Sequence, residues 1–257
     1  MAEAIIAGIK KASLDANISV GEPVAARRDQ LSASYGVTVY ETNAPAIEGS
    51  NIIIFAIKPQ QLDEAVQEVA PLISPQQSVI SIIAGVRIHS LGLKLNHGRI
   101  IRVMPNTAAR VGRGISVWTH TNEVPNQVLN FTRIMLQSLG REVYLSDEKL
   151  LDVATAVSAS GPAYVFSFLE ALSDAAVLLG MPSDKARTLA LETILGSAHL
   201  ANETGEHPAA LRNMVTSPGG TTAAALHALE EGNFTSSIIN AVRAAHQRSE
   251  ELGSGLK

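Results

Sequence analysis

Short apolar runs alternate with polar stretches up to about residue 146, at 18–20, 37–40, 51–56, 78–83, 100–103, 115–118 and 142–145. Some runs, such as Ile52-Ile53-Ile54-Phe55, are apolar at every position, which is typical of parallel strands covered by helices on both faces. Helical candidates, of which Gln60–Val69 is one, lie between the runs at the spacing of strand–helix–strand units. The pattern predicts an α/β unit for this part of the chain.

From about Asp147 the pattern predicts helices alone. One helix is expected to start at Ser183 or Asp184, either of which can cap it, and to end before Gly205. A further helix is expected from Phe234 onward. The first carries Ala and Leu at helical spacing, and the second carries Phe, Ile, Ala and Val in the same way, so we expect a second subunit to cover them. The change of pattern places the domain boundary between 1–146 and 147–257.

The composition is that of a globular protein with enough apolar material for a sizeable core: 46% apolar and 17% charged residues in a chain of 257. The net charge of -4 leaves no basic excess for binding nucleic acid. The absence of cysteine excludes disulfides and thiol nucleophiles, and the seven histidines show no metal-ligand spacing, so no metal is expected. No apolar run approaches the roughly 20 residues of a membrane span. We therefore expect a soluble, cytoplasmic protein without nucleic-acid or membrane partners.

The most informative segment is a turn that leads into a helix, Thr216-Ser217-Pro218-Gly219-Gly220-Thr221-Thr222. We expect Pro218 in the first helical turn, and the two glycines allow backbone N–H groups to approach a ligand closely. Free N–H groups at a helix N-terminus suit a carboxylate or a phosphate. A capped loop with Ser217 as N-cap explains the same residues without a ligand. The residues alone leave both interpretations open.

Small or polar loops follow three predicted strands, at Ala56–Pro59, Ala84–Gly85 and Met104–Thr107. Ligands of open α/β sheets bind beyond the carboxyl ends of the strands, so the three loops together predict one ligand crevice. A fourth segment, Ser158–Tyr164, places Gly-Pro inside a helical stretch, where it must kink or restart the helix.

Taken together, these segments resemble pyrroline-5-carboxylate reductase, and the resemblance covers essentially the whole chain. It implies the reduction of 1-pyrroline-5-carboxylate to proline with NADPH or NADH, the last step of proline biosynthesis. It also implies a Rossmann-type, mostly parallel sheet followed by an all-helical domain for substrate binding and dimerisation. The expected assembly is a homodimer, built into larger rings of dimers.

The resemblance implies roles for individual residues. The substrate carboxylate is expected at the N–H groups of Gly219, Gly220 and Thr221, with a contact from the Ser217 hydroxyl. Thr222 is the candidate catalytic residue, which orients the ring nitrogen or protonates it, directly or through water. The cofactor is expected along Asn43, Ala56, Ile57, Lys58, Pro59, Ala84, Gly85 and Glu148.

The resemblance favours NADP, whereas the residues leave the choice open. Glu22 suits a free ribose diol, and Arg27 and Arg28 suit a 2′-phosphate, although a solvated helix face also explains the two arginines.

The family's first strand and Gly-x-Gly-Asn-Met-Ala loop correspond here only to Met1-Ala2. We therefore expect that the first strand is missing and that the chain as given binds dinucleotide poorly. One alternative is a non-enzymatic oligomerising relative that has lost its pyrophosphate loop. Another is a related dehydrogenase acting on a hydroxy acid, although neither Lys149 nor Lys185 lies in a suitable motif.

Overall fold

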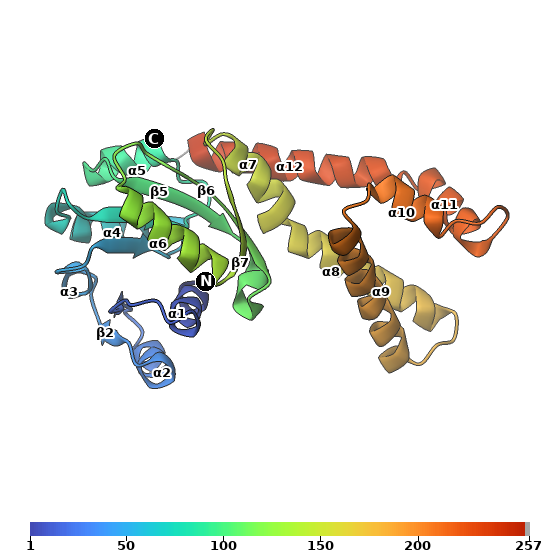
Figure 1. Ribbon diagram of the computed structural model, residues 1–257, viewed down its shortest axis with the longest axis horizontal. Coiled ribbons are helices and arrows are strands. Elements are labelled where there is room, and N and C mark those ends of the chain that lie inside the picture. Colours follow the sequence, from blue (N-terminus) through green and yellow to red (C-terminus); the bar gives the residue numbers. More distant parts are fainter. Residues whose placement is uncertain (255–257) are drawn as a thin grey trace. The chain divides into compact units, whose positions relative to one another are not determined.

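The computed structural model describes residues 1–254, which form two compact units (Figure 1). Of the described residues, the first unit contains 1–160 and 245–254, and the second contains 161–244. Every element between residues 145 and 254 is helical, in agreement with the predicted change of pattern. The compact units nevertheless divide later than residue 146, because the first helix after the sheet and the last turns of the C-terminal helix belong to the first unit.

The first unit is built on a sheet of five strands in the order β3-β4-β5-β6-β7. Neighbouring strands are parallel except for the pair β5 and β6. The segment between β5 and β6 is too short for the crossover that a parallel pair needs, so the chain turns back. The bounds are β3 Ile52–Phe55, β4 Ser78–Ser81, β5 Ile100–Pro105, β6 Gly114–His120 and β7 Gly140–Tyr144.

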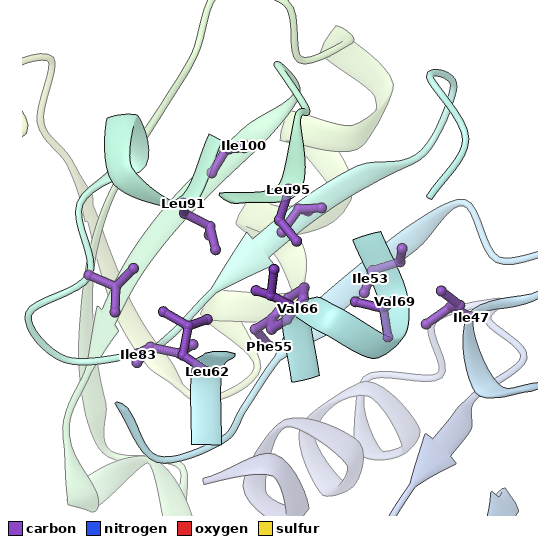
Figure 2. Packing of buried hydrophobic residues seen from close by; sticks show 12 residues of the cluster. Ile47, Ile53, Phe55, Leu62, Val66, Val69, Ile83, Leu91, Leu95 and Ile100 are labelled. Atoms are coloured by element: carbon purple, nitrogen blue, oxygen red, sulfur yellow. The ribbon is translucent and has the colours of Figure 1, made fainter. Parts of the chain in front are cut away.

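Helices cover both faces of this sheet, as its uniformly apolar strands predict. On one face α4 and α5 pack over β3, β4 and β5, and Figure 2 shows Leu62 and Val66 of α4 and Leu91 of α5 in one cluster with Phe55 there. On the other face α1 and α6 pack on Ile80 and Trp118. The helices and short helical turns of this part are α1 Ala2–Lys11, α2 Ala25–Tyr35, α3 Ala44–Ile47, η1 Pro59–Gln61, α4 Leu62–Val69, η2 Ala70–Leu72, α5 Ile88–Leu95, η3 Thr107–Val111 and α6 Asn126–Gln137.

Two further strands, β1 Ser19–Gly21 and β2 Thr38–Tyr40, form a separate parallel pair. Ile6 of α1 packs on this pair with Leu31 and Val37. Neither β1 nor β3 pairs with another strand on its second edge within residues 1–254.

The helices after the sheet are α7 Leu150–Ala154, the π-helical turn η4 Thr155–Ala159, α8 Gly161–Leu178, α9 Ser183–Thr204, α10 Pro208–Met214, α11 Thr221–Glu231 and α12 Phe234–Ser254. The predicted restart at Gly-Pro is confirmed, because the π-helical turn ends at Ala159 and, after Ser160, α8 begins at Gly161. The predicted cap of α9 is wrong. Pro182 is the N-cap, and Ser183 and Asp184 already belong to the helix.

In the part of the chain that the structure describes, no helix combines the length and the apolarity that crossing a membrane requires. Residues 1–254 also contain no cluster of His, Asp or Glu side chains that could hold a metal ion.

Candidate active site

Residues Ser217–Gly220 form a hydrogen-bonded turn directly before α11. The N–H of Gly220 donates to the carbonyl of Ser217 over 3.1 Å. Gly219 has a φ of +69°, the left-handed conformation that a type II turn requires at its third position. Pro218 takes the second position, which its fixed φ favours, so the expectation that it lies in the first helical turn is wrong.

Gly220, and not Ser217, is the N-cap of α11. The Ser217 hydroxyl instead lies against Cα of Gly220, so closely that a Cβ at this position would collide with it. The N–H of Gly220 is used inside the turn, which removes it from the predicted set of anion donors. The described residues supply no acceptor for the N–H groups of Gly219 and Thr221, so these two N–H groups remain candidate donors to an anion.

Thr222 lies in the first turn of α11 and is half-buried. Its hydroxyl has no hydrogen-bond partner among the described residues. The first turn of a helix carries partial positive charge and unpaired N–H groups. Thr222 therefore offers a free hydroxyl at a place that favours an anion.

The loops after β3 and β4 lie at the same edge of the sheet. Phe55 of β3 pairs with Ser81 of β4, and Ser81 pairs with Arg102 of β5. Phe55 and Ser81 are the last residues of their strands, so Ala56–Pro59 and Ala84–Gly85 both lie beyond the carboxyl ends of neighbouring strands. The side chain of Lys58 is exposed. Gly85 is buried and has a φ of +75°, and Leu252 packs against it. Two of the predicted cofactor segments are therefore brought together at the carboxyl edge.

Asn43 is held by a carboxylate that we did not predict from the sequence. The Glu68 carboxylate in α4 accepts hydrogen bonds from the Asn43 backbone N–H over 2.6 Å, from the Asn43 side-chain amide over 2.5 Å and from the Ala44 N–H over 2.9 Å. Burial of the Glu68 carboxylate raises its pKa, but these hydrogen bonds outweigh burial and leave the pKa below its usual value. The Oδ1 atom of Asn43 lies against Gly21 at the end of β1.

Glu148 belongs to a partly buried cluster of charges that we did not predict from the sequence. Its Oε1 atom accepts from Nη1 of Arg102 over 3.0 Å and from the N–H of Ile88 over 2.8 Å. Arg102 also donates to Asp152, which is 3% exposed on its side chain. A signal was available, because Arg102 is the one charged residue of an otherwise apolar strand.

The residues considered for the cofactor's 2′-position all have partners within the protein. Glu22 accepts the N–H of Val24, and Arg28 donates to the carbonyls of Glu22 and Pro23, each over 2.8 Å. Arg27 pairs with Glu3 over 2.7 Å, and this hydrogen bond lowers the pKa of Glu3.

The predicted site residues fall into two groups on different compact units. Asn43, Ala56–Pro59, Ala84–Gly85 and Glu148 are in the first unit, and Ser217–Thr222 is in the second.

Comparison with known proteins identifies the family. The chain is 44% identical to a pyrroline-5-carboxylate reductase of Synechocystis sp. over 255 residues, which cover 98% of this chain and 95% of that protein. The chain belongs to the pyrroline-5-carboxylate reductase family. A second relative of that name, from Pseudomonas aeruginosa, is 35% identical, and the match covers 100% of this chain and 94% of that protein. The model of the family described as pyrroline-5-carboxylate reductase dimerisation matches residues 148–252, and the one described as NADP oxidoreductase, coenzyme F420-dependent, matches 1–85.

Solved structures of the family have the same fold. A pyrroline-5-carboxylate reductase from Coxiella burnetii superposes with a TM-score of 0.89 at 32% identity, covering 98% of this chain and 94% of that one. A pyrroline carboxylate reductase from Plasmodium falciparum, solved with NADP bound, superposes with a TM-score of 0.87 at 29% identity. The match covers 97% of this chain and 93% of that one. The predicted Rossmann-type sheet followed by a helical domain is confirmed. A prephenate dehydrogenase from A. aeolicus, at 11% identity, shares only the fold.

Proposed function

We propose that this chain reduces 1-pyrroline-5-carboxylate to L-proline, the last step of proline biosynthesis. NAD(P)H transfers a hydride to the imine carbon of the ring, which becomes C5 of proline, while the ring nitrogen gains a proton, so that the C=N bond becomes a single bond and NAD(P)⁺ is released. The observation that carries this proposal is 44% identity to a reductase of this name over 98% of the chain. The test is an assay of NADPH and NADH oxidation by the purified chain, driven by 1-pyrroline-5-carboxylate. The absence of turnover with either cofactor would contradict it.

The substrate carboxylate is proposed to bind at the start of α11. The N–H groups of Gly219 and Thr221 lack acceptors among the described residues, and the helix dipole favours an anion there. The Ser217 hydroxyl is held beside Gly220 and supplies a further donor. Gly220 contributes by allowing this close approach, because any side chain would push the hydroxyl away.

Thr222 is proposed to orient the ring nitrogen and to deliver its proton, directly or through water. A Thr hydroxyl is a weak acid, so its contribution lies in positioning the proton. We expect Thr222→Ala to lower kcat about 10²-fold or more, in the range of general acid–base effects. The dissociation constant of NADPH should stay within about twofold of the wild-type value.

Thr222→Ser is the matched control for this experiment, because it retains the hydroxyl and should retain most of the turnover. Steady-state kinetics measures the effect on turnover, and NADPH fluorescence titration measures the effect on cofactor affinity. Unchanged turnover in Thr222→Ala would remove Thr222 from the mechanism.

The cofactor is proposed to lie along Asn43, the Ala56–Pro59 loop with Ile57 and Lys58, and the Ala84–Gly85 turn. These segments follow strand ends, where nucleotides bind in open α/β sheets. NADPH is the proposed physiological cofactor, supported by the NADP oxidoreductase family match over residues 1–85. A lower KM for NADH than for NADPH would contradict this choice.

The assembly is a homo-oligomer, in keeping with the dimerisation family match over residues 148–252. We propose a homodimer that assembles further into a ring of dimers and works in the cytoplasm. Analytical ultracentrifugation tests the assembly, and a species no larger than a dimer would exclude the ring.

A further inference from the structure

Four charged side chains are clustered beside the loop that follows β4. Arg102 is 1% exposed and donates to Oε1 of Glu148 over 3.0 Å and to Oδ1 of Asp152 over 3.1 Å. Arg87 donates to the other oxygen of Asp152 over 3.2 Å. Two cations thus face two carboxylates. A planar guanidinium suits this place because it bridges two carboxylates from a fixed position, whereas an ammonium is a single point of charge.

The cluster holds the chain where the loop passes into α5. Arg87 follows Gly85 and Val86 directly and is the N-cap of α5, and its side chain bonds to Asp152. Glu148 accepts the N–H of Ile88, the first residue of the helix, over 2.8 Å. The position of the Ala84–Gly85 turn therefore depends on where the two carboxylates lie.

The last turns of α12 are joined to the same cluster. The hydroxyl of Ser249 donates to Oδ1 of Asp152 over 3.1 Å. Leu252 packs on the turn, since a Cβ added to Gly85 would lie 2.8 Å from the Leu252 Cβ. Gly253 lies beside the guanidinium of Arg87. The Gly85 turn is thus held from the α5 side by Arg87 and Glu148 and is covered by α12.

We propose that Arg102 is a positioning residue for NAD(P)H binding. It fixes Glu148 and Asp152, and these in turn hold Arg87 and Ile88, so that the Ala84–Gly85 turn keeps the conformation that accepts the cofactor. Arg102 acts only through these partners and does not touch the cofactor. This inference rests on the proposed function, which places the cofactor at the Ala84–Gly85 turn.

The test compares the charge-balanced variant Arg102→Met/Asp152→Asn with the full wild-type chain. Removing one cation and one carboxylate keeps the charge of the cluster balanced, and the two charges that remain, Arg87 and Glu148, are 36% and 27% exposed on their side chains, unlike the buried Arg102 and Asp152. The matched control is Lys94→Met/Asp63→Asn, which removes an exposed ion pair of 2.8 Å between α5 and α4. NADPH affinity is measured by fluorescence titration without substrate, and the exchange rate of the Ile88 amide by hydrogen–deuterium exchange.

We expect the dissociation constant and the KM of NADPH to rise about tenfold in Arg102→Met/Asp152→Asn, and exchange at Ile88 to accelerate. The KM for 1-pyrroline-5-carboxylate and kcat at saturating NADPH should stay within about twofold of wild type. Arg102→Lys retains the positive charge but not the planar guanidinium that bridges the two carboxylates, so it should give an intermediate NADPH affinity. The control pair should match the wild type throughout.

Two results would overturn the proposal in distinguishable ways. If the wild type binds NADPH and Arg102→Met/Asp152→Asn binds it equally well, Arg102 has no positioning role and the proposed function stands. If the wild type itself binds neither NADPH nor NADH, the proposed function fails, and the role of Arg102 fails with it.

Discussion

At the scale of single residues, Asn43 depends on a carboxylate from another element. Three donors from Asn43 and Ala44 converge on Glu68, and their hydrogen bonds lower its pKa below the usual 4.5 despite burial. A lowered pKa means that the ionised form stabilises the fold. This stabilisation is fully present above pH 4.5 and is lost as the pH falls through the pKa of the folded state.

We therefore expect Glu68→Gln to be less stable than the wild type at neutral pH, with a difference that shrinks as the pH falls below 4.5. Urea unfolding followed by the fluorescence of Trp118, the single and buried tryptophan, measures this. Glu64→Gln on the same helix is the control, since its carboxylate has no hydrogen-bond partner among the described residues. A constant difference at all pH values would contradict the expectation.

Removing Arg102 alone should cost much of the chain's stability, because its guanidinium is buried and paired with buried Asp152. Arg102→Met leaves the carboxylate of Asp152 buried without its nearer cation, and breaking a buried pair in this way typically costs about 3–5 kcal/mol. We expect a loss of that size in the free energy of unfolding, measured by urea titration. The balanced variant Arg102→Met/Asp152→Asn should lose clearly less, and an equal loss in both would show that charge balance is not the cause.

At the scale of elements, the turn before α11 depends on Gly219. Its φ of +69° is accessible to glycine but costs other residues about 1–2 kcal/mol. Pro218 and Gly219 together form the type II turn, and this turn places Ser217 over Gly220 at the start of the helix. The geometry of the proposed carboxylate site is thus set within one short segment.

We expect Gly219→Ala to raise the KM for 1-pyrroline-5-carboxylate several-fold, because the strained turn shifts the N–H groups and the Ser217 hydroxyl. The KM for NADPH should not change. Gly232→Ala at the other end of α11 is the control, since Gly232 has a φ of -73° and a Cβ there would make only ordinary contacts of 3.4 Å or more. Equal KM values in Gly219→Ala and the wild type would argue against this carboxylate site.

At the scale of the whole molecule, the second unit carries an unusual amount of exposed apolar surface. Phe166, Leu178 and Leu179 are 63%, 88% and 89% exposed in the single chain. Apolar patches of this kind mark surfaces that bind another chain. The dimerisation family match over residues 148–252 covers all three positions.

We expect Phe166→Asp to weaken self-association, because it places a charge on a surface that a second copy should cover. Sedimentation velocity over a range of concentrations measures the shift toward smaller species. Leu93→Asp is the control, since Leu93 is 70% exposed but lies on α5 of the first unit. Equal association in Phe166→Asp and the wild type would exclude Phe166 from the interface.

Features that depend on neighbouring residues could be predicted before any contact between distant elements was known. The uniformly apolar run of β3 predicts a strand covered on both faces, Gly161-Pro162 predicts a helix restart, and the motif around Ser217–Thr222 indicates the family. In each of these cases the decisive side chains are adjacent, so propensity and spacing are sufficient.

Contacts between residues far apart in the chain could not be predicted in this way. Asn43 and Glu68 are hydrogen-bonded although they lie 25 residues apart in the sequence. Asp152 is hydrogen-bonded to Arg102 at a separation of 50 residues and to Ser249 at a separation of 97. No local pattern specifies such pairs, because each carboxylate could be solvated at its own position and gains its partner only when the elements pack. The same holds for the N-cap at Gly220, where the turn hydrogen bond decided between two residues that both make good caps.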